Sequence, residues 1–150
     1  MKIFLDADAC PKVIKEALFK VAIKRKIPLT LVADKFIQVP NSEFITFIKV
    51  STGMDAADDK IVELINDGDL LISEDIPLAD RAVSKGALVV SMHGNLLDER
   101  NIKERLSIRD MMAEMRDAGM ETSGQRPFSD KDRQNFINQL DKVLTKLLKK

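Results

Sequence analysis

The chain has 150 residues, the size of one ordinary domain, and its 24 basic and 24 acidic residues cancel. This balance excludes a protein that coats nucleic acids or membrane surfaces through overall charge, so any site for a polyanion must be local. The single cysteine, Cys10, cannot form an internal disulfide, and no apolar run is long enough to span a bilayer. No signal peptide is recognisable either. We therefore expect one cytoplasmic domain, residues 1–150, with no membrane partner.

The first half of the chain alternates between patterns typical of strands and helices. Residues 3–5 form an apolar run without alternation, as in a central parallel strand, and an aspartate follows the run directly. A helix is predicted from Pro11 to the basic residues 24–26, because apolar side chains recur there at helical spacing. Two further strands are predicted over residues 29–33 and 44–50.

The second half continues this alternation and ends in two longer helices. One helix is predicted from Asp55 to Gly68, and a shorter one from Pro77 to Gly86. The other predicted elements are strands at residues 70–72 and 87–90, helices at 101–117 and 129–148, and a polar loop at 119–128. The alternation predicts an α/β fold with a mostly parallel central sheet of about five strands, flanked by helices, with two helices at the C-terminus.

Two aspartates, Asp6 and Asp8, stand where the first strand leaves the sheet and a helix is about to begin. In open α/β sheets this edge is where ligands bind. Clustered carboxylates repel one another, so they persist mainly where a hard cation such as Mg²⁺ or Mn²⁺ neutralises them. The alternative is structural: Asp8 would cap the helix that begins at Pro11, and Asp6 would pair with a buried arginine.

A third aspartate, Asp58, is predicted to point inward from its helix. On an ideal helix beginning at Asp55 it shares the arc of the apolar residues, while Asp55 lies at the edge of that arc. An unpaired inward aspartate is costly, so Asp58 needs a metal, a cation or a hydrogen-bond network. The preceding Ser51 and Thr52 offer hydroxyls that could bind a phosphate. The alternative, attraction of acids to the first turn of a helix, explains Asp55 better than Asp58.

Asp75 follows the strand at residues 70–72, as Asp6 follows the first strand. Asp80 lies one turn further along the next helix and is either a ligand of a second metal ion or solvated. We therefore predict a Mg²⁺ or Mn²⁺ site built from strand-end and helix acids. The central ligands are Asp6, Asp58 and Asp75, and the further candidates are Asp8, Asp55 and Asp80.

Three arginines, Arg105, Arg109 and Arg116, fall on the apolar face of the helix at residues 101–117. Guanidinium groups are tolerated on such a face when they are paired with carboxylate or phosphate. We expect them to point inward, where they either neutralise the aspartates directly or bind a phosphate that the metal also contacts.

Several common motifs are absent. Neither a P-loop nor a dinucleotide-binding glycine pattern occurs, and His93 is the only histidine, which argues against zinc sites and histidine triads. Cys10 is expected to be a small packed residue. Tryptophan and tyrosine are absent, which weakens the case for a protein that only binds single strands.

The sequence DADACP at 6–11, GMDAAD at 53–58, DIPLA at 75–79 and PFS at 127–129 resembles the YaiI/YqxD family of uncharacterised bacterial proteins over nearly the whole chain. The order of the acids is also similar to that of the PIN-like nuclease superfamily, in which aspartates at strand ends hold Mg²⁺ or Mn²⁺ for phosphodiester hydrolysis. This resemblance implies a PIN-like domain in which Asp6, Asp58 and Asp75 occupy the acidic positions.

The chain departs from the family pattern at two places. Met92, His93 and Gly94 stand where a proline, an arginine and a glycine are expected, and Gln125 interrupts an expected glycine-proline turn. If the missing arginine contacts substrate in the family, its loss would weaken activity in this chain.

Three functions compete at this point. The leading one is a metal-dependent nuclease acting on RNA or DNA, in which Arg105 and Arg109 hold the phosphate. The second is a phosphatase of the haloacid-dehalogenase type, with Asp6 and Asp8 as nucleophile and general acid, although no lysine followed by a strand-end aspartate pair is found in the later half. The third is a non-catalytic protein that binds RNA or a partner through the arginine face.

Overall fold

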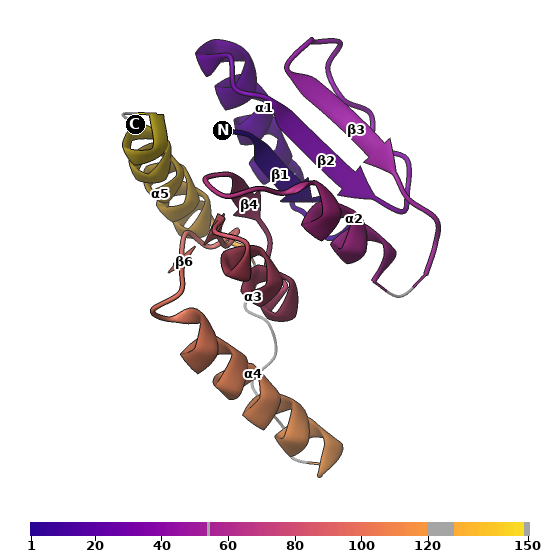
Figure 1. Ribbon diagram of the computed structural model, residues 1–150, viewed down its shortest axis with the longest axis vertical. Helices are drawn as coiled ribbons and strands as arrows, with labels where there is room; N and C mark the ends of the chain where they lie inside the picture. Colours follow the sequence, from indigo (N-terminus) through magenta and orange to yellow (C-terminus); the bar gives the residue numbers. More distant parts are fainter. Residues whose placement is uncertain (54, 120–127, 149–150) are drawn as a thin grey trace.

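The computed structural model describes residues 1–53, 55–119 and 128–148, which form a sheet covered by helices on both faces (Figure 1). Six strands and five helices occur in these residues. In chain order they are β1 (Ile3–Asp6), α1 (Lys12–Arg25), β2 (Leu29–Ala33), β3 (Ile45–Lys49), α2 (Ala56–Leu64), β4 (Leu70–Ile72), α3 (Ile76–Ser84), β5 (Leu88–Val90), β6 (Leu96–Leu97), α4 (Ile102–Asp117) and α5 (Asp130–Leu148).

The strand order is β3-β2-β1-β4-β5-β6, with β1 to β5 parallel and β6 antiparallel to β5. The chain first builds outward from β1 to β3, then crosses back and builds outward from β4 in the other direction. The order therefore reverses between β1 and β4, whose register pairs Leu5 with Ile72. In sheets of this kind, the crevice at the carboxyl ends of the two strands flanking the reversal is the usual place for a ligand.

Alternation along β1 decides which way its last side chain points. Ile3 and Leu5 pack with the core under α1 and α5, whereas Phe4 packs with the core under α2 and α3. Because successive side chains of a strand point to opposite faces, Asp6 is in phase with Phe4. Its carboxylate therefore faces the side of the sheet that carries α2 and α3.

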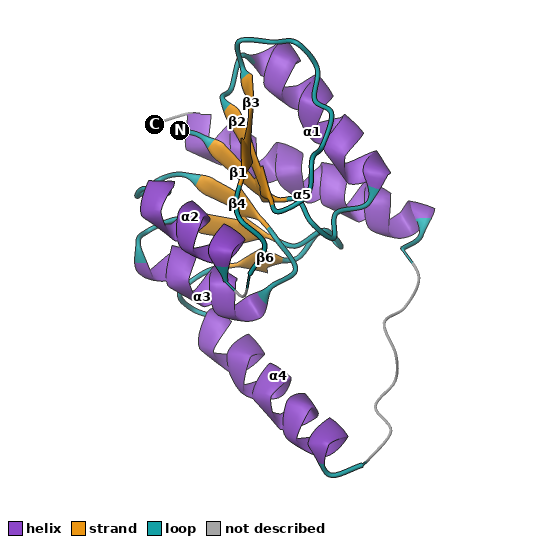
Figure 2. Cartoon of the chain, turned by 90° about the vertical axis from the view of Figure 1, so that its right-hand side faces the viewer, coloured by secondary structure: helices purple, strands orange, loops and turns teal. Residues whose placement is uncertain are grey.

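The helices form two layers around the sheet (Figure 2). Helices α1 and α5 cover one face, and α2 and α3 cover the other. Helix α4 begins against α3 with Ile102 buried, and then extends away from the body of the molecule. No described helix combines the length and the apolar character needed to cross a membrane.

The expected α/β fold with a mostly parallel sheet is confirmed, and the strands at Leu29–Ala33 and Leu70–Ile72 match their predicted limits. One strand was missed: β6 has only two residues, Leu96–Leu97, too few to show a periodic pattern. The polar loop predicted before α5, including Gln125, falls largely on residues 120–127, outside the described part of the chain.

The predicted end of the second helix is wrong, because α2 stops at Leu64 and does not reach Gly68. Ile65 has extended backbone angles, and the N–H of Asn66 donates to the Asp69 carboxylate (2.9 Å) in place of a helical carbonyl. A side-chain acceptor three residues further on thus competes with the last helical turn.

Candidate metal centre

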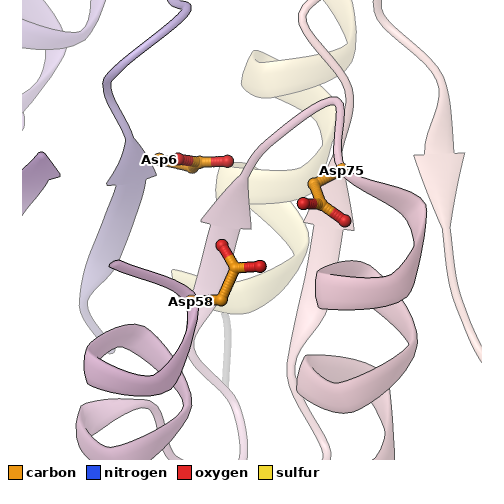
Figure 3. Close-up of side chains that lie close together, drawn as sticks. All are labelled: Asp6, Asp58 and Asp75. Carbon is orange, nitrogen blue, oxygen red and sulfur yellow. The ribbon is translucent and has the colours of Figure 1, made fainter. Parts of the chain in front are cut away.

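Three aspartate side chains converge at the carboxyl end of the sheet, where β1 and β4 are neighbours (Figure 3). Asp6 ends β1, Asp58 lies in the first turn of α2, and Asp75 is the N-cap of α3. One carboxylate oxygen of each lies within 4.8 Å of those of the other two, and all three side chains are half-buried. The three central ligands predicted from sequence are therefore close enough to share one ion.

Ser73 holds two of these residues in place. Its side chain is fully buried at the end of β4, and its hydroxyl donates to Oδ2 of Asp6 at 3.0 Å. The hydroxyl oxygen of Ser73 also accepts a hydrogen bond from the backbone N–H of Asp75 at 3.0 Å. One hydroxyl thus connects the ends of two adjacent strands, which fixes Asp6 relative to the start of α3.

Asp75 has a structural task as well. Its Oδ1 accepts the backbone N–H of Leu78 at 3.0 Å and so caps α3, whose second residue is Pro77. A carboxylate has two oxygens, so capping through Oδ1 does not prevent Asp75 from binding a cation through Oδ2.

The electrostatics of the cluster disfavour three negative charges. Burial raises the pKa of Asp58 to about 6, and the charges of Asp75 and Asp6 add to this shift. Burial also raises the pKa of Asp6, against the opposing hydrogen bond from Ser73, and the charge of Asp75 raises it further. A cation among the carboxylates would relieve both effects, because it favours their ionised forms.

The donor set fits a hard divalent cation. Each member of the cluster offers a carboxylate oxygen, the ligand that Mg²⁺, Mn²⁺ and Ca²⁺ prefer over nitrogen or sulfur. A pocket of about 340 Å³ opens beside the cluster, and its walls include Asp6, Asp75, Glu74 and Arg109. The space allows an ion to keep water ligands or to meet a substrate oxygen.

The other predicted acids do not join the group. Asp8 is exposed, and both of its oxygens accept the backbone N–H of Asp34, at 3.0 and 3.2 Å. Asp55 is exposed at the N-cap of α2 with φ +66°, and Asp80 pairs with Nζ of Lys103 at 2.8 Å.

The structural alternatives for the first two aspartates are wrong. Among the residues that the structure describes, no side chain caps α1, so Asp8 does not have that role. Asp6 is bound by the hydroxyl of Ser73, whereas the alternative required a buried arginine.

The predicted orientation of the arginines is also wrong. Arg105, Arg109 and Arg116 are all exposed, because α4 buries Ile102 and then leaves the body of the protein. Arg109 nevertheless lines the pocket beside Asp6 and pairs weakly with Asp110 (3.6 Å). The predicted phosphate-binding hydroxyls of Ser51 and Thr52 are exposed in the connection before α2.

Two residues at this site, Glu74 and His93, were not among the predicted site residues. Glu74 lines the pocket, and its Oε1 is bound by the backbone N–H of His93 (3.2 Å) and by the imidazole Nδ1 (2.9 Å). His93 also approaches the buried Asp132 through Nε2, at 4.0 Å. The acid-rich sequence around Glu74 could have indicated this residue. Its contact with His93, 19 positions away, has no signal in the sequence.

Cys10 is buried, and burial raises the pKa of its thiol to about 12. A thiol of this kind is neutral at physiological pH and a poor nucleophile. The prediction of a small packed residue is confirmed.

Fold and site together define a three-layered α/β protein with a carboxylate cluster at the reversal point of its sheet. The chain belongs to the YaiI/YqxD family, described as uncharacterised, whose model matches residues 4–146. It is 54% identical to a UPF0178 protein of Maridesulfovibrio salexigens over 99% of this chain and 98% of the relative. A UPF0178 protein of Colwellia psychrerythraea is 50% identical over 99% of both chains. No solved structure gives a significant match, so the likeness to PIN-like nucleases stays a prediction.

Proposed function

We propose that this protein is a divalent-metal-dependent nuclease that hydrolyses phosphodiester bonds in RNA or DNA. The observation that carries the proposal is the convergence of Asp6, Asp58 and Asp75 within 4.8 Å beside an open pocket. These residues would hold Mg²⁺ or Mn²⁺. When bound, such an ion polarises a phosphoryl oxygen and lowers the pKa of an attacking water.

The protein's own groups prepare the site for this chemistry. Ser73 fixes the orientation of Asp6, and capping of α3 fixes Asp75, so two ligands are preorganised on rigid elements. Arg109 lines the same pocket as Asp6 and Asp75 and is the cation that would bind a non-bridging phosphate oxygen. Arg105 and Arg116, exposed along α4, could bind neighbouring phosphates of a polymer.

No contact among the described residues favours the phosphatase alternative. It requires Asp6 and Asp8 to act on one substrate, yet the Asp8 carboxylate is engaged by the backbone of Asp34 and lies outside the cluster. The non-catalytic alternative predicts binding that needs no metal and no turnover, which the next experiment separates from catalysis.

The test is cleavage of end-labelled single-stranded RNA, single-stranded DNA and duplex DNA by the purified chain in Mn²⁺, Mg²⁺ or EDTA. We expect cleavage that depends on metal and falls at least about 100-fold in Asp58→Asn, since a ligand of the ion is lost. Asp59→Asn is the matched control, because Asp59 is the next residue of α2, is exposed and pairs with Arg81. Absence of cleavage of every substrate in both metals, or equal cleavage by the two variants, would overturn the proposal.

A further inference from the structure

An unusually exposed aromatic ring lies in the segment that follows β2. Phe36 follows β2 and is 76% exposed, the highest value among the exposed large hydrophobic side chains of the described residues. Its ring packs against the ring of Phe47 of β3, with centroids 6.0 Å apart and an interplanar angle of 88°. This T-shaped contact holds the Phe36 ring while most of its surface stays open to solvent.

The ring forms one wall of a groove of about 590 Å³, whose other wall is the start of α1. Lys12 and Lys15 project into this groove from the first turns of α1, and the exposed Lys35 precedes Phe36. Glu16 also lines the groove, at 3.9 Å from a Lys12 side chain that stays 85% exposed. The groove therefore combines an open aromatic face with more cations than acids.

Asp8 connects this groove to the aspartate cluster. Its carboxylate accepts the backbone N–H of Asp34, so the segment that carries Phe36 is tied to the loop that follows Asp6. Ala9 lines the pocket of the cluster, and Lys12 lines the groove. Three residues span at most about 11 Å, so the two sites adjoin around the carboxyl edge of the sheet.

From this arrangement we propose that the groove binds single-stranded nucleic acid, with a base stacked on Phe36 and phosphates bound by Lys12 and Lys15. The strand then continues over the loop at Asp8 to the aspartate cluster. The proposal rests on the nuclease function and names its substrate as single-stranded. An open aromatic ring beside lysines is the usual combination for single strands, because every unpaired base offers a face for stacking. The bases of a duplex are stacked on one another, so a duplex cannot use the ring.

The lysines and the exposed ring together favour a single strand of nucleic acid over a protein segment. An apolar protein segment would gain nothing from Lys12, Lys15 and Lys35, and an acidic peptide would not need an open aromatic face. Phe36 supplies the stacking surface in a chain that has neither tryptophan nor tyrosine.

The test measures binding of the full chain in EDTA, so that cleavage plays no part. Fluorescence anisotropy with a labelled 12-nucleotide pyrimidine strand, RNA or DNA, is compared with the corresponding duplex. We expect Phe36→Leu, which keeps an apolar side chain but lacks the ring, to weaken single-strand binding about tenfold. Ile23→Ala is the control, because Ile23 is 46% exposed near the other end of α1. It should leave the affinity unchanged.

Two further variants test the ring and the cations separately. Phe36→Trp should preserve affinity, and its indole, the only one in the chain, should be quenched by a single strand and not by a duplex. Replacing Lys12 and Lys15 by glutamine should reduce the slope of log K against log salt by about 1.4, the value for two phosphates of a single strand.

Equal binding by Phe36→Leu and the unchanged chain, or an indole that no strand quenches, would overturn the proposal even if the protein cleaves RNA. Binding that depends on Phe36 without cleavage in Mn²⁺ would keep the groove proposal as a binding site and overturn the nuclease function. The outcomes therefore distinguish the two proposals.

Discussion

The Ser73 hydroxyl donates to Asp6 Oδ2 at 3.0 Å, and this contact joins the ends of the two strands between which the sheet order reverses. The residues are 67 positions apart in the chain. The hydrogen bond lowers the pKa of Asp6 against the larger effect of burial, so it favours the ionised form that a cation requires.

Ser73→Ala should therefore destabilise the protein and weaken the site. It removes the acceptor of the Asp75 N–H and the donor to Asp6 in a fully buried position, which costs about 1–3 kcal/mol. Urea unfolding at pH 7 measures this loss. Ser84→Ala is the control, because the Ser84 hydroxyl donates an exposed hydrogen bond to the Asp80 carbonyl of its own helix, and its effect should stay within about 0.5 kcal/mol. Equal stabilities of the two variants would contradict the assigned role of Ser73.

Asp58→Asn should stabilise the metal-free protein at neutral pH. The pKa of Asp58 is raised from 3.8 to about 6, so between these values the native state binds more protons than the unfolded chain. The free energy of unfolding then falls as the pH rises through this window and stays low above it. The neutral asparagine removes the loss of stability that the ionised carboxylate causes. Because solvent screens a half-buried position, this loss is about 1 kcal/mol.

Thermal unfolding in EDTA from pH 4 to pH 8 tests this expectation. Asp58→Asn should unfold about 2–4 °C above the unchanged chain at pH 7.5, the shift that ~1 kcal/mol produces in a domain of this size. The difference should vanish near pH 4, and Asp59→Asn should not show it. A variant less stable at pH 7.5 than the unchanged chain would refute the repulsion argument.

Mn²⁺ should stabilise the folded protein, because the unfolded chain has no preformed cluster. A concentration about 100 times the dissociation constant adds ~2.7 kcal/mol, or about 5–10 °C in melting temperature. The increase should shrink below pH 6, where a proton on Asp58 competes with the ion. It should disappear in Asp6→Asn and persist in Asp80→Asn, since Asp80 pairs with Lys103 outside the cluster. An equal shift in Asp6→Asn would place the ion elsewhere.

Asp75 allows its two tasks to be separated by two substitutions. Asp75→Asn keeps an acceptor for the Leu78 N–H and should leave the stability nearly unchanged while it weakens Mn²⁺ binding. Asp75→Ala should lose both the N-cap hydrogen bond and Mn²⁺ binding, and the lost cap should cost about 1 kcal/mol of stability. Chemical unfolding and metal titration of both variants measure the two effects independently. If the asparagine variant binds Mn²⁺ as tightly as the unchanged chain, Asp75 is a cap and not a ligand.

The parts of the fold that could be predicted are those whose signal is local. Buried parallel strands are short apolar runs, and the limits of β4 (Leu70–Ile72) could be predicted from the polar residues directly before and after it in the sequence. The inward direction of Asp58 followed from the position of Ile61 on the same helix, and the raised pKa of Asp58 is consistent with it.

The predictions that were wrong concern side chains whose orientation depends on which other element packs against them. A helical projection shows that Arg105 and Arg109 share a face with apolar residues, but it cannot show that α4 leaves the body after Ile102. The direction of Asp8 is likewise set by a backbone N–H 26 residues away, at Asp34. Such contacts have no signature in the spacing of residues along the chain.

Gly94→Ala should be among the most damaging single substitutions near the site. Gly94 has φ +91°, and an added Cβ would lie 2.6–2.7 Å from the backbone carbonyl of Asn135 in α5. Gly68 is the matched control, because it also has positive φ (+86°) but nothing within 4 Å of the added Cβ. Gly68→Ala should cost about 1–2 kcal/mol of backbone strain alone.

Gly94→Ala should cost a further 1–3 kcal/mol or more for the overlap with α5, since a helix backbone cannot move as a side-chain end can. Urea unfolding of both variants gives the difference. Because Gly94 follows His93, which holds Glu74 at the pocket, the displaced turn should also weaken the proposed Mn²⁺-dependent cleavage beyond the effect of Gly68→Ala. Equal losses of stability in the two variants would show that the turn between β5 and β6 does not press against α5.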